Sequence, residues 1–281
     1  MVANTNVNED LAIERLGKTT RQPQGIGISS DAIVLIPARL ASSRLPDKPL
    51  APIGDAPMIV HVWRQAVAAE IGEVVVACAE RKIADAIEGA GGRAVLPAPD
   101  LPSGTDRVKA ALDQIDPDKQ VRRVVNLQGD LPDVPPAFVR AVLEPIDDDG
   151  ADIGTLVVAT DKKTDRGNQS VVKAAVAFSD EEERCGRALY FSRATIPSGE
   201  GSLLHHIGVY GFSRPALDRF TALPPSRLER RERLEQLRAL EANMTIGVRR
   251  IPYPPLEVND PEDLDLARER IAADRGAVKE D

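Results

Sequence analysis

Three cations follow one apolar strand near the N-terminal end of the chain. The segment IVLIPARLASSRLPDKPL covers residues 33–50 and carries Arg39, Arg44 and Lys48 directly after its apolar run. Open α/β sheets bind ligands at the carboxyl ends of their strands, and small residues such as Ala38 let backbone N–H groups approach phosphate oxygens. The pattern indicates a cradle for a polyphosphate. A solvated basic loop, the alternative, has a similar composition.

A second polar group ends another apolar run, at VNLQGDLP, residues 125–132. Gly129 closes the strand and delivers Asp130 to the ligand-binding edge of the sheet, with Gln128 beside it. Carboxylate oxygens are ligands that Mg²⁺ prefers, so Asp130 is a candidate for holding that ion against nucleotide phosphates. Taken alone, a Gly-Asp pair after a strand is also a common turn.

Alternating strands and helices position these residues. From Asp31 onward, apolar runs predict strands at 33–37, 73–79, near 94–96 and 121–127. Spacings of 3.6 residues predict a helix between each strand and the next, at about 57–69, about 81–90 and about 104–115. Short apolar strands separated by helices favour a mostly parallel, Rossmann-like sheet covered on both faces. We therefore expect an α/β fold.

After about residue 150 the pattern changes to strands with turn-rich connections, predicted at 152–159, 170–178, 187–197, 205–212 and 245–251. Helices are predicted at about 215–222, at about 227–242 behind a capping box of Ser226 and Glu229, and from Pro261 onward. We expect one domain at 31–275, with a nucleotide-binding part at about 31–150. A smaller mixed or antiparallel subdomain at about 151–245 and a return to the sheet at about 246–275 complete it.

Composition excludes several classes of protein. The net charge of −8 and the aromatic content of 3% argue against a nucleic-acid binder, so a nucleotide ligand would be a single mononucleotide in a pocket. The two cysteines predict a reduced protein rather than a disulfide scaffold. The chain has no run that could span a membrane and no secretion signal, so we expect a cytoplasmic protein. Residues 1–30 are predicted to be a flexible leader.

These motifs resemble the sugar nucleotidyltransferases, in the form used by 3-deoxy-manno-octulosonate (KDO) cytidylyltransferases, also called CMP-KDO synthetases. The segments SGTDRV, ALYFSRATIP, HHIGVYGF and LEQLRALE extend the resemblance over nearly all of residues 32–272. SGTDRV is also a plain N-cap at the start of a helix. The resemblance implies the same α/β fold, with a sugar-binding and dimerisation subdomain, and a homodimer.

The resemblance also assigns candidate site residues. Nucleotide contacts are implied for Ala38, Arg39, Lys48, Ser103, Gly104, Arg107 and Gln128, with Arg39, Arg44, Lys48 and Asp130 as the catalytic set. Sugar contacts are implied for His206, Tyr210, Glu235 and Gln236, and Arg193 is a candidate cation for the sugar carboxylate. Each has a structural alternative, such as a strand-capping histidine, a core tyrosine, or Glu235 paired with Arg231 or Arg238.

Two segments depart from the family pattern. The family usually carries a second metal-binding aspartate in a VDTPEDL-like string, whereas this chain reads EVNDPEDL, with Asn259 at the aspartate position and Asp260 after it. An amide oxygen can bind Mg²⁺ but brings no charge, so either Asn259 or Asp260 is the second expected ligand. SGEG at 198–201, the other departure, stands where many relatives carry charged residues.

The implied reaction joins CTP and KDO to CMP-KDO and pyrophosphate with Mg²⁺ as cofactor, for lipopolysaccharide biosynthesis. Two alternatives stay open. One is a cytidylyltransferase for a related sugar acid, such as 8-amino-KDO or a nonulosonate. The other is a catalytically silent nucleotide-binding paralogue, which the Asn259 substitution would allow. A GTP-dependent molybdenum-cofactor enzyme is disfavoured, because residues 37–48 lack its glycine-rich loop.

Overall fold

The computed structural model describes residues 31–41 and 44–277, so the predicted leader at 1–30 lies outside the described residues. The described chain divides into two compact units. The discontinuous unit comprises residues 31–139 and 255–277, and the central unit comprises Arg140–Pro254. These divisions lie near the expected ones at about 150 and 245, although the central unit keeps the strand at Ile246–Ile251.

The discontinuous unit alternates strands and helices. Its elements are β1 (Ala32–Ala38), the 3₁₀ helix η1 (Lys48–Leu50), β2 (Pro52–Ile53), β3 (Ala56–Pro57), α2 (Met58–Ala68), β4 (Glu73–Cys78), α3 (Arg81–Gly89), β5 (Arg93–Val95), α4 (Gly104–Ile115), β6 (Arg123–Asn126) and α11 (Pro261–Ala277). Helix α5 (Pro136–Ala141) spans the division between the units.

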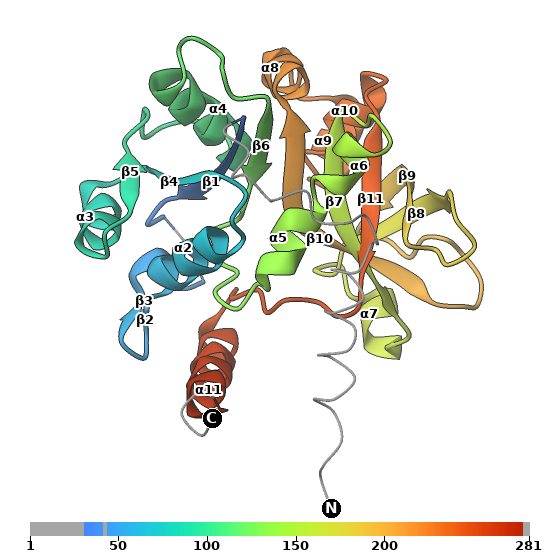
Figure 1. Cartoon of the computed structure of the whole chain (residues 1–281). Coiled ribbons are helices and arrows are strands. Elements are labelled where there is room, and N and C mark those ends of the chain that lie inside the picture. Colours follow the sequence, from blue (N-terminus) through green and yellow to red (C-terminus); the bar gives the residue numbers. More distant parts are fainter. Residues whose placement is uncertain (1–30, 42–43, 278–281) are drawn as a thin grey trace, which may run out of the picture. The chain divides into compact units, whose positions relative to one another are not determined.

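The sheet of this unit has the strand order β5-β4-β1-β6, and all its strand pairs are parallel. Figure 1 shows α4 on one face of these strands and α2 and α3 on the other. Because helices cover both faces, every residue of β1 is buried, which explains its continuous apolar sequence. The carboxyl end of this central strand leads directly into the cationic loop.

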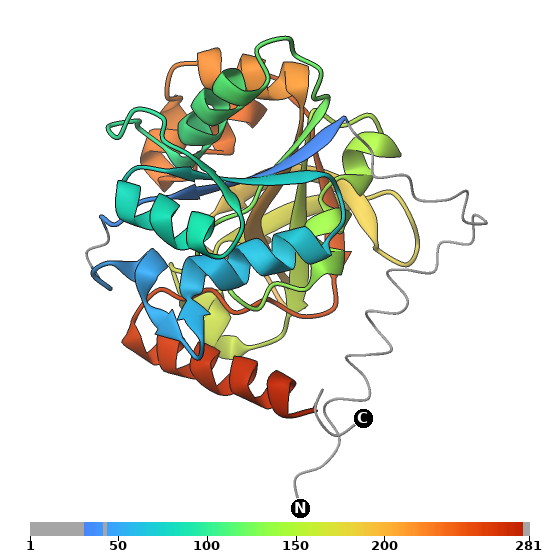
Figure 2. The same cartoon turned by 60° about the vertical axis from the view of Figure 1, so that its left-hand side comes forward.

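Helix α11 completes the discontinuous unit by packing beside the short hairpin of β2 and β3 (Figure 2). Leu264 and Ala267 of the helix join Ile53, Met58 and Val258 in one buried cluster. The Arg268 Nε donates a hydrogen bond to the Pro52 carbonyl, 3.0 Å away. This packing fixes the segment before the helix, which carries Asn259.

The central unit is built mainly from antiparallel strands. Its elements are α6 (Glu144–Asp147), β7 (Ile153–Thr160), α7 (Lys163–Gly167), β8 (Lys173–Phe178), β9 (Cys185–Ser192), β10 (Leu203–Ser213), α8 (Arg214–Ala222), α9 (Arg227–Glu232), α10 (Leu237–Glu241) and β11 (Ile246–Ile251).

The strand order in the central unit is β10-β7-β11-β9-β8, and β8 also pairs with β10, so the pairings of these described strands form a ring. Only the pairing of β11 with β7 is parallel among the pairs described in this unit. Gly154 of β7 allows a close approach, because a Cβ there would lie 1.9 Å from the Val142 carbonyl oxygen. No helix among the described residues is long and apolar enough to cross a membrane.

The prediction of a single helix at about 227–242 was wrong. The structure has α9 and α10 instead, separated at Arg233, whose φ of 57° is left-handed and ends the first helix. The capping box of Ser226 and Glu229 is present as predicted. Glu229 also accepts two hydrogen bonds from Arg238, at 2.9 and 2.6 Å, so a largely buried ion pair joins the two short helices.

Candidate active site

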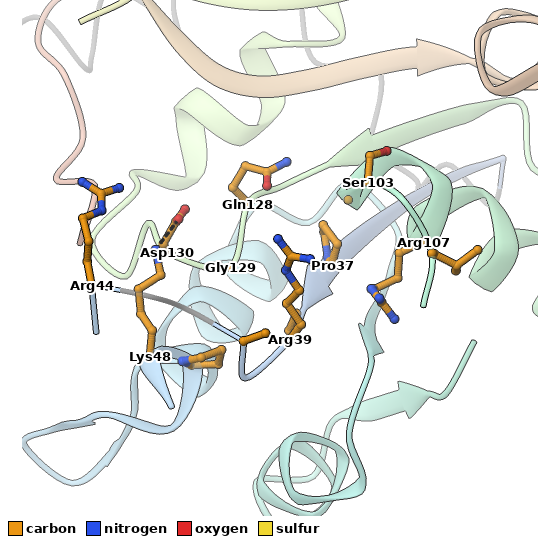
Figure 3. A pocket seen from close by; sticks show the side chains of 14 residues that line it. Pro37, Arg39, Arg44, Lys48, Ser103, Arg107, Gln128, Gly129 and Asp130 are labelled. Carbon is orange, nitrogen blue, oxygen red and sulfur yellow. Dashed lines mark hydrogen bonds and ion pairs between the residues drawn. The ribbon is translucent and has the colours of Figure 1, made fainter. Parts of the chain in front are cut away.

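A cavity of about 370 Å³ lies in the discontinuous unit where β1 and β6 end (Figure 3). Residues from three segments line it: Pro37, Ala38, Arg39, Ala41, Arg44, Lys48, Pro49, Leu101, Ser103, Gly104, Arg107, Gln128, Gly129 and Asp130. Gly129, just after β6, lies close to the end of β1, because a Cβ there would lie 3.2 Å from the Pro37 carbonyl oxygen. The structure thus brings together all the nucleotide-site residues expected from the sequence.

The cationic loop places its three cations differently. Arg39 is exposed at the cavity wall and makes no side-chain hydrogen bond with any described residue. The Lys48 Nζ lies 2.8 Å from Asp130 Oδ2 and 2.9 Å from the Val258 carbonyl oxygen. The Arg44 Nη2 donates to Asn259 Oδ1 at 2.9 Å. Arg39 is therefore the cation of this loop that is open to an anion in the described structure.

Asp130 and the segment before α11 meet at the edge of this cavity. The Val258 N–H donates to the Asp130 carbonyl at 2.9 Å, which fixes the two segments side by side. Lys48 already gathers the Asp130 carboxylate and the Val258 carbonyl around one ammonium group. Oxygen donors therefore converge here on a cation, and hard oxygen donors suit Mg²⁺.

The donor set for a metal is small. No group of three or more His, Cys, Asp or Glu side chains in the described part of the chain is placed to hold a metal ion. Asp130 with the Asn259 amide oxygen nevertheless fits Mg²⁺, because that ion commonly takes one or two carboxylates and completes its shell with phosphates and water.

Asp260 has a structural task in the fold. Its Oδ1 accepts the Asp263 N–H at 3.1 Å, and the Asp263 Oδ2 accepts the Asn259 N–H at 2.8 Å. These two contacts cap the start of α11, where acidic side chains are favourable. Of the two residues expected from the sequence, Asn259 is therefore the better candidate for the second Mg²⁺ ligand.

The turn before α4 holds the next predicted group. Ser103 caps the helix, accepting the Asp106 N–H at 3.1 Å. Arg107 is buried, and its guanidinium donates to the carbonyls of Ala98 and Pro99 at 3.3 and 3.0 Å. Burial lowers the pKa of Arg107 from its ordinary value. Arg107 therefore organises the loop that borders the cavity, in addition to lining it.

Gln128 lines the cavity and connects the end of β6 to the start of α4. Its Nε2 donates to Asn126 Oδ1 at 3.1 Å, and the Asn126 amide in turn donates to the Thr105 hydroxyl. This chain of hydrogen bonds leaves the Gln128 amide oxygen beside Gly104, at the cavity. An oxygen acceptor at that position could receive an amino or hydroxyl hydrogen of a nucleoside.

Two carboxylates at this site were missed in the sequence. Glu80 Oε2 accepts the Leu40 N–H at 2.9 Å and so anchors the loop that carries Arg39. Much of Glu257 is open to solvent, yet loss of water around its carboxyl group, followed by the charge of Asp130, raises its pKa. Glu80, like Asp130, lies just after a strand at the ligand-binding edge of the sheet. That position could have identified it as a candidate site residue from the sequence.

The expected sugar-site residues lie in the central unit. His206 and Tyr210, both on β10, have ring centroids 5.5 Å apart, and the Phe191 ring stands edge-on to His206 at 4.8 Å. The Thr155 hydroxyl donates to the Val209 carbonyl at 2.9 Å, so the His206 Nε2–H donates to the Thr155 oxygen, 3.0 Å away. The other ring nitrogen, Nδ1, is then an acceptor.

Glu235 and Gln236 follow the break between α9 and α10. Burial and then the charge of Glu235 raise the pKa of Tyr210, so the Tyr210 hydroxyl stays protonated and can donate. Gln236 is 6% exposed, and its amide makes no hydrogen bond with a described residue. A polar group so placed is suited to a polar ligand.

Arg193 is held by the backbone. Its Nε donates to the Glu232 carbonyl at 3.0 Å, Nη1 to the Gln169 carbonyl at 2.9 Å, and Nη2 to the Arg233 carbonyl at 3.4 Å. A guanidinium has five N–H groups, so two remain for a ligand such as a sugar carboxylate. These carbonyl contacts could not be predicted from the amino-acid pattern.

The neutral state of His206 predicts an acid-sensitive stability. Burial depresses its pKa from 6.5 to about 3. The unfolded chain takes up the proton below pH 6.5, so this contribution to stability is complete above that pH and is lost as the pH falls toward 3. When the pH is lowered from 7.5 to 5.0, the unfolding free energy of the natural protein should therefore fall by about 2 kcal/mol more than that of the His206→Gln variant. Urea denaturation at both pH values measures this difference, and equal losses would contradict the neutral assignment.

Comparisons with known proteins agree with this geometry. A family model described as cytidylyltransferase matches residues 33–246. A 3-deoxy-manno-octulosonate cytidylyltransferase of Parvibaculum lavamentivorans is 53% identical over 251 residues, covering 89% of this chain and 96% of that protein. One from Rhodospirillum centenum is 55% identical over 245 residues, covering 87% and 95%.

Solved structures include a similar molecule. It is described as CMP:2-keto-3-deoxy-manno-octonic acid synthetase complexed with CTP and is 34% identical to this chain, with a TM-score of 0.78. The match covers 87% of this chain and 100% of the chain in that structure. The likeness therefore extends through both units.

Proposed function

The chain belongs to the family of 3-deoxy-manno-octulosonate cytidylyltransferases, and on that premise we propose that it joins CTP to KDO, giving CMP-KDO and pyrophosphate. The cavity at the ends of β1 and β6 carries this proposal. It combines exposed Arg39, the pair of Lys48 with Asp130, and the capped turn at Ser103. Such a set of groups binds a nucleoside triphosphate and stabilises charge on a leaving phosphate.

The reaction is an in-line displacement at phosphorus. The anomeric hydroxyl oxygen of KDO bonds to the α-phosphorus of CTP, and its proton leaves. The bond from that phosphorus to the oxygen that bridges to the β-phosphate breaks, and pyrophosphate departs with the electron pair. Positioning and neutralisation of charge supply most of the catalysis in such reactions. Arg39, Arg44 and Lys48 are proposed to neutralise the departing pyrophosphate.

Magnesium is part of the proposal. Asp130 and Asn259 would hold it, and the ion would supply charge neutralisation at the phosphates. Because Asn259 adds no charge, Asp130 provides the anionic oxygen of this pair. Lys48 keeps one oxygen of Asp130 oriented and bonds to the Val258 carbonyl at the same time.

The sugar acid is proposed to bind in the central unit. His206 Nδ1 would accept a sugar hydroxyl hydrogen, Tyr210 would donate from its protonated hydroxyl, and Gln236 would do both. Glu235 would accept a further hydroxyl. The two remaining N–H groups of Arg193 would bind the carboxylate.

Three further parts of the proposal rest on family membership. We place the reaction in the cytoplasm, assign its product to lipopolysaccharide biosynthesis, and take the active form as a homodimer. Sedimentation velocity of the full chain tests the last of these.

Pyrophosphate release from each of the four nucleoside triphosphates tests the proposed function. KDO, 8-amino-KDO and a nonulosonate would serve as acceptors, with Mg²⁺ present. We expect release with CTP and KDO at least tenfold faster than with any other pair. Faster release with another sugar acid would reassign the substrate, and CTP binding without release from any pair would identify a silent paralogue.

A further inference from the structure

Lys173 is a fully buried ammonium group in the central unit. It begins β8, where it pairs with Ser192 of β9 and with His205 of β10. Its side chain is 0% exposed. Nζ donates to the Asn168 carbonyl at 2.6 Å and to the Arg193 carbonyl at 3.0 Å. Among the residues that the structure describes, no carboxylate lies within ion-pair distance of it.

Such a lysine is costly to the fold. An ammonium group removed from water is unfavourable unless a counter-charge or several hydrogen bonds compensate for the lost hydration. Burial accordingly lowers the pKa of Lys173. An apolar side chain of similar volume would fill this space without that cost. The charge of Asp165 offsets part of this cost, and the two carbonyl groups that Lys173 joins are its direct hydrogen-bond partners.

Those carbonyl groups belong to the segments that hold Arg193. The first is the carbonyl of Asn168, and the next residue, Gln169, accepts the Arg193 Nη1. The second is the carbonyl of Arg193 itself. Lys173 therefore fixes both the backbone of Arg193 and one of the acceptors of its side chain.

Arg193 passes this constraint to the end of α9. Its Nε donates to the Glu232 carbonyl, and the Glu232 carboxylate accepts the Arg193 N–H at 3.1 Å and the Ser192 hydroxyl at 2.9 Å. Lys173 and Arg193 thus join three segments, at 168–169, 192–193 and 232–233. We call these two cations and their carbonyl acceptors the carbonyl clasp.

The last of these segments leads directly into two proposed sugar ligands. Arg233 has left-handed backbone geometry, and Glu235 and Gln236 follow within three residues. Glu235 acts electrostatically on Tyr210, which lies beside His206. The carbonyl clasp, together with the two hydrogen bonds that the Glu232 carboxylate accepts, therefore connects the segments that carry Lys173 and Arg193 to the turn that presents Glu235 and Gln236.

We propose that Lys173 is a positioning residue for the acidic sugar: through the carbonyl clasp it sets the turn at 232–236 and the orientation of Arg193. This inference rests on the proposed function for the identity of the substrate. Lys173 touches neither substrate in this account. Its loss should weaken use of the sugar acid while the nucleotide cavity, in the other unit, keeps its own contacts.

Steady-state kinetics of Lys173→Met test the inference. Methionine keeps much of the volume and removes the charge and the donors. We expect the KM for KDO to rise at least tenfold, with the KM for CTP changed less than twofold. Lys163→Met, an exposed lysine at the start of α7, is the matched control and should change neither value. An unchanged KM for KDO, or equal rises in both KM values, would overturn the proposal.

Hydrogen exchange of the full chain gives a readout that needs no turnover. In Lys173→Met, the backbone amides of residues 232–237 should exchange at least fivefold faster than in the natural protein, and those of β1 should not change. Equal exchange at 232–237 would refute the carbonyl clasp even if the natural protein were inactive toward KDO. Inactivity of the natural protein with a changed exchange pattern would refute the proposed function instead.

A second variant covers the case in which Lys173→Met does not fold. Glutamine has a shorter side chain whose amide nitrogen we expect to reach at most one of the two carbonyl groups. Lys173→Gln should therefore show a KM for KDO between those of the natural protein and the methionine variant. A KM for KDO equal to that of the natural protein would count against the proposal.

Discussion

Replacing Asp130 by alanine is expected to lower kcat/KM for cytidylyl transfer by at least about 10³-fold while the protein stays folded. Asp130 provides an anionic oxygen that lines the cavity, and Asn259, the other proposed ligand, contributes an uncharged amide. A 10³-fold loss corresponds to about 4 kcal/mol of transition-state stabilisation. Initial rates of pyrophosphate release from CTP and KDO measure it.

The fold should tolerate this change. The Asp130 side chain is 25% exposed, and the Lys48 ammonium keeps its second hydrogen bond, to the Val258 carbonyl, when the carboxylate is removed. Asp130→Asn keeps an amide oxygen and should be intermediate in rate. Asp118→Ala, which changes an exposed aspartate of the same unit, is the control and should be fully active. An Asp130→Ala protein with near-natural, Mg²⁺-dependent turnover would remove the basis for the proposed site.

Replacing Arg238 by alanine should produce the largest loss of stability among the changes considered. The Arg238 guanidinium is 8% exposed, donates twice to Glu229, and lies 4.9 Å from the centre of the Phe220 ring. Alanine would leave the Glu229 carboxylate, 13% exposed, without this partner. Removing one partner of a buried pair costs about 3 kcal/mol or more.

Chemical denaturation measures this loss, and Tm should fall by roughly 6–10 °C. Arg231→Ala, at an exposed position within α9, should change the unfolding free energy by less than about 0.5 kcal/mol. Because the pair holds α9 against α10, the KM for KDO should rise as well. A loss below about 1 kcal/mol would show that the pair contributes little to the fold.

The sequence predicted the cavity well because its signals are local. A buried strand that ends in small residues and cations, and a second strand that ends in Gly-Asp, each place their polar groups by backbone geometry alone. Parallel strands then bring those ends to one sheet edge. The residues at these two strand ends line the same cavity or its rim for that reason, whereas Ser103, Gly104 and Arg107, which also line it, were expected from the family resemblance.

The contacts of the arginines could not be predicted in this way. Arg107 and Arg193 were predicted to bind substrate, but Arg107 donates to carbonyl groups of the preceding loop and Arg193 to carbonyl groups of distant loops. A carbonyl acceptor carries no mark in the sequence, because every residue has one. Lys173 was missed for the same reason.

The break at Arg233 shows a different limit. The spacing at 227–242 is helical on both sides of the break, and a left-handed arginine has no local signature comparable with glycine. What stabilises the break is tertiary, since Arg193 donates to the carbonyls of Glu232 and Arg233. The substitution at 259 also needed the structure, which shows Asp260 capping α11 while Asn259 faces Arg44.

The most direct test of the account is ³¹P nuclear magnetic resonance of one reaction that contains the natural protein, CTP, KDO and Mg²⁺. Displacement at the α-phosphorus requires CMP-KDO and pyrophosphate to appear in equal amounts as CTP disappears. We expect that equality, with no free CMP formed at the same rate. Pyrophosphate with free CMP, or unchanged CTP beside a folded protein, would contradict cytidylyl transfer to KDO.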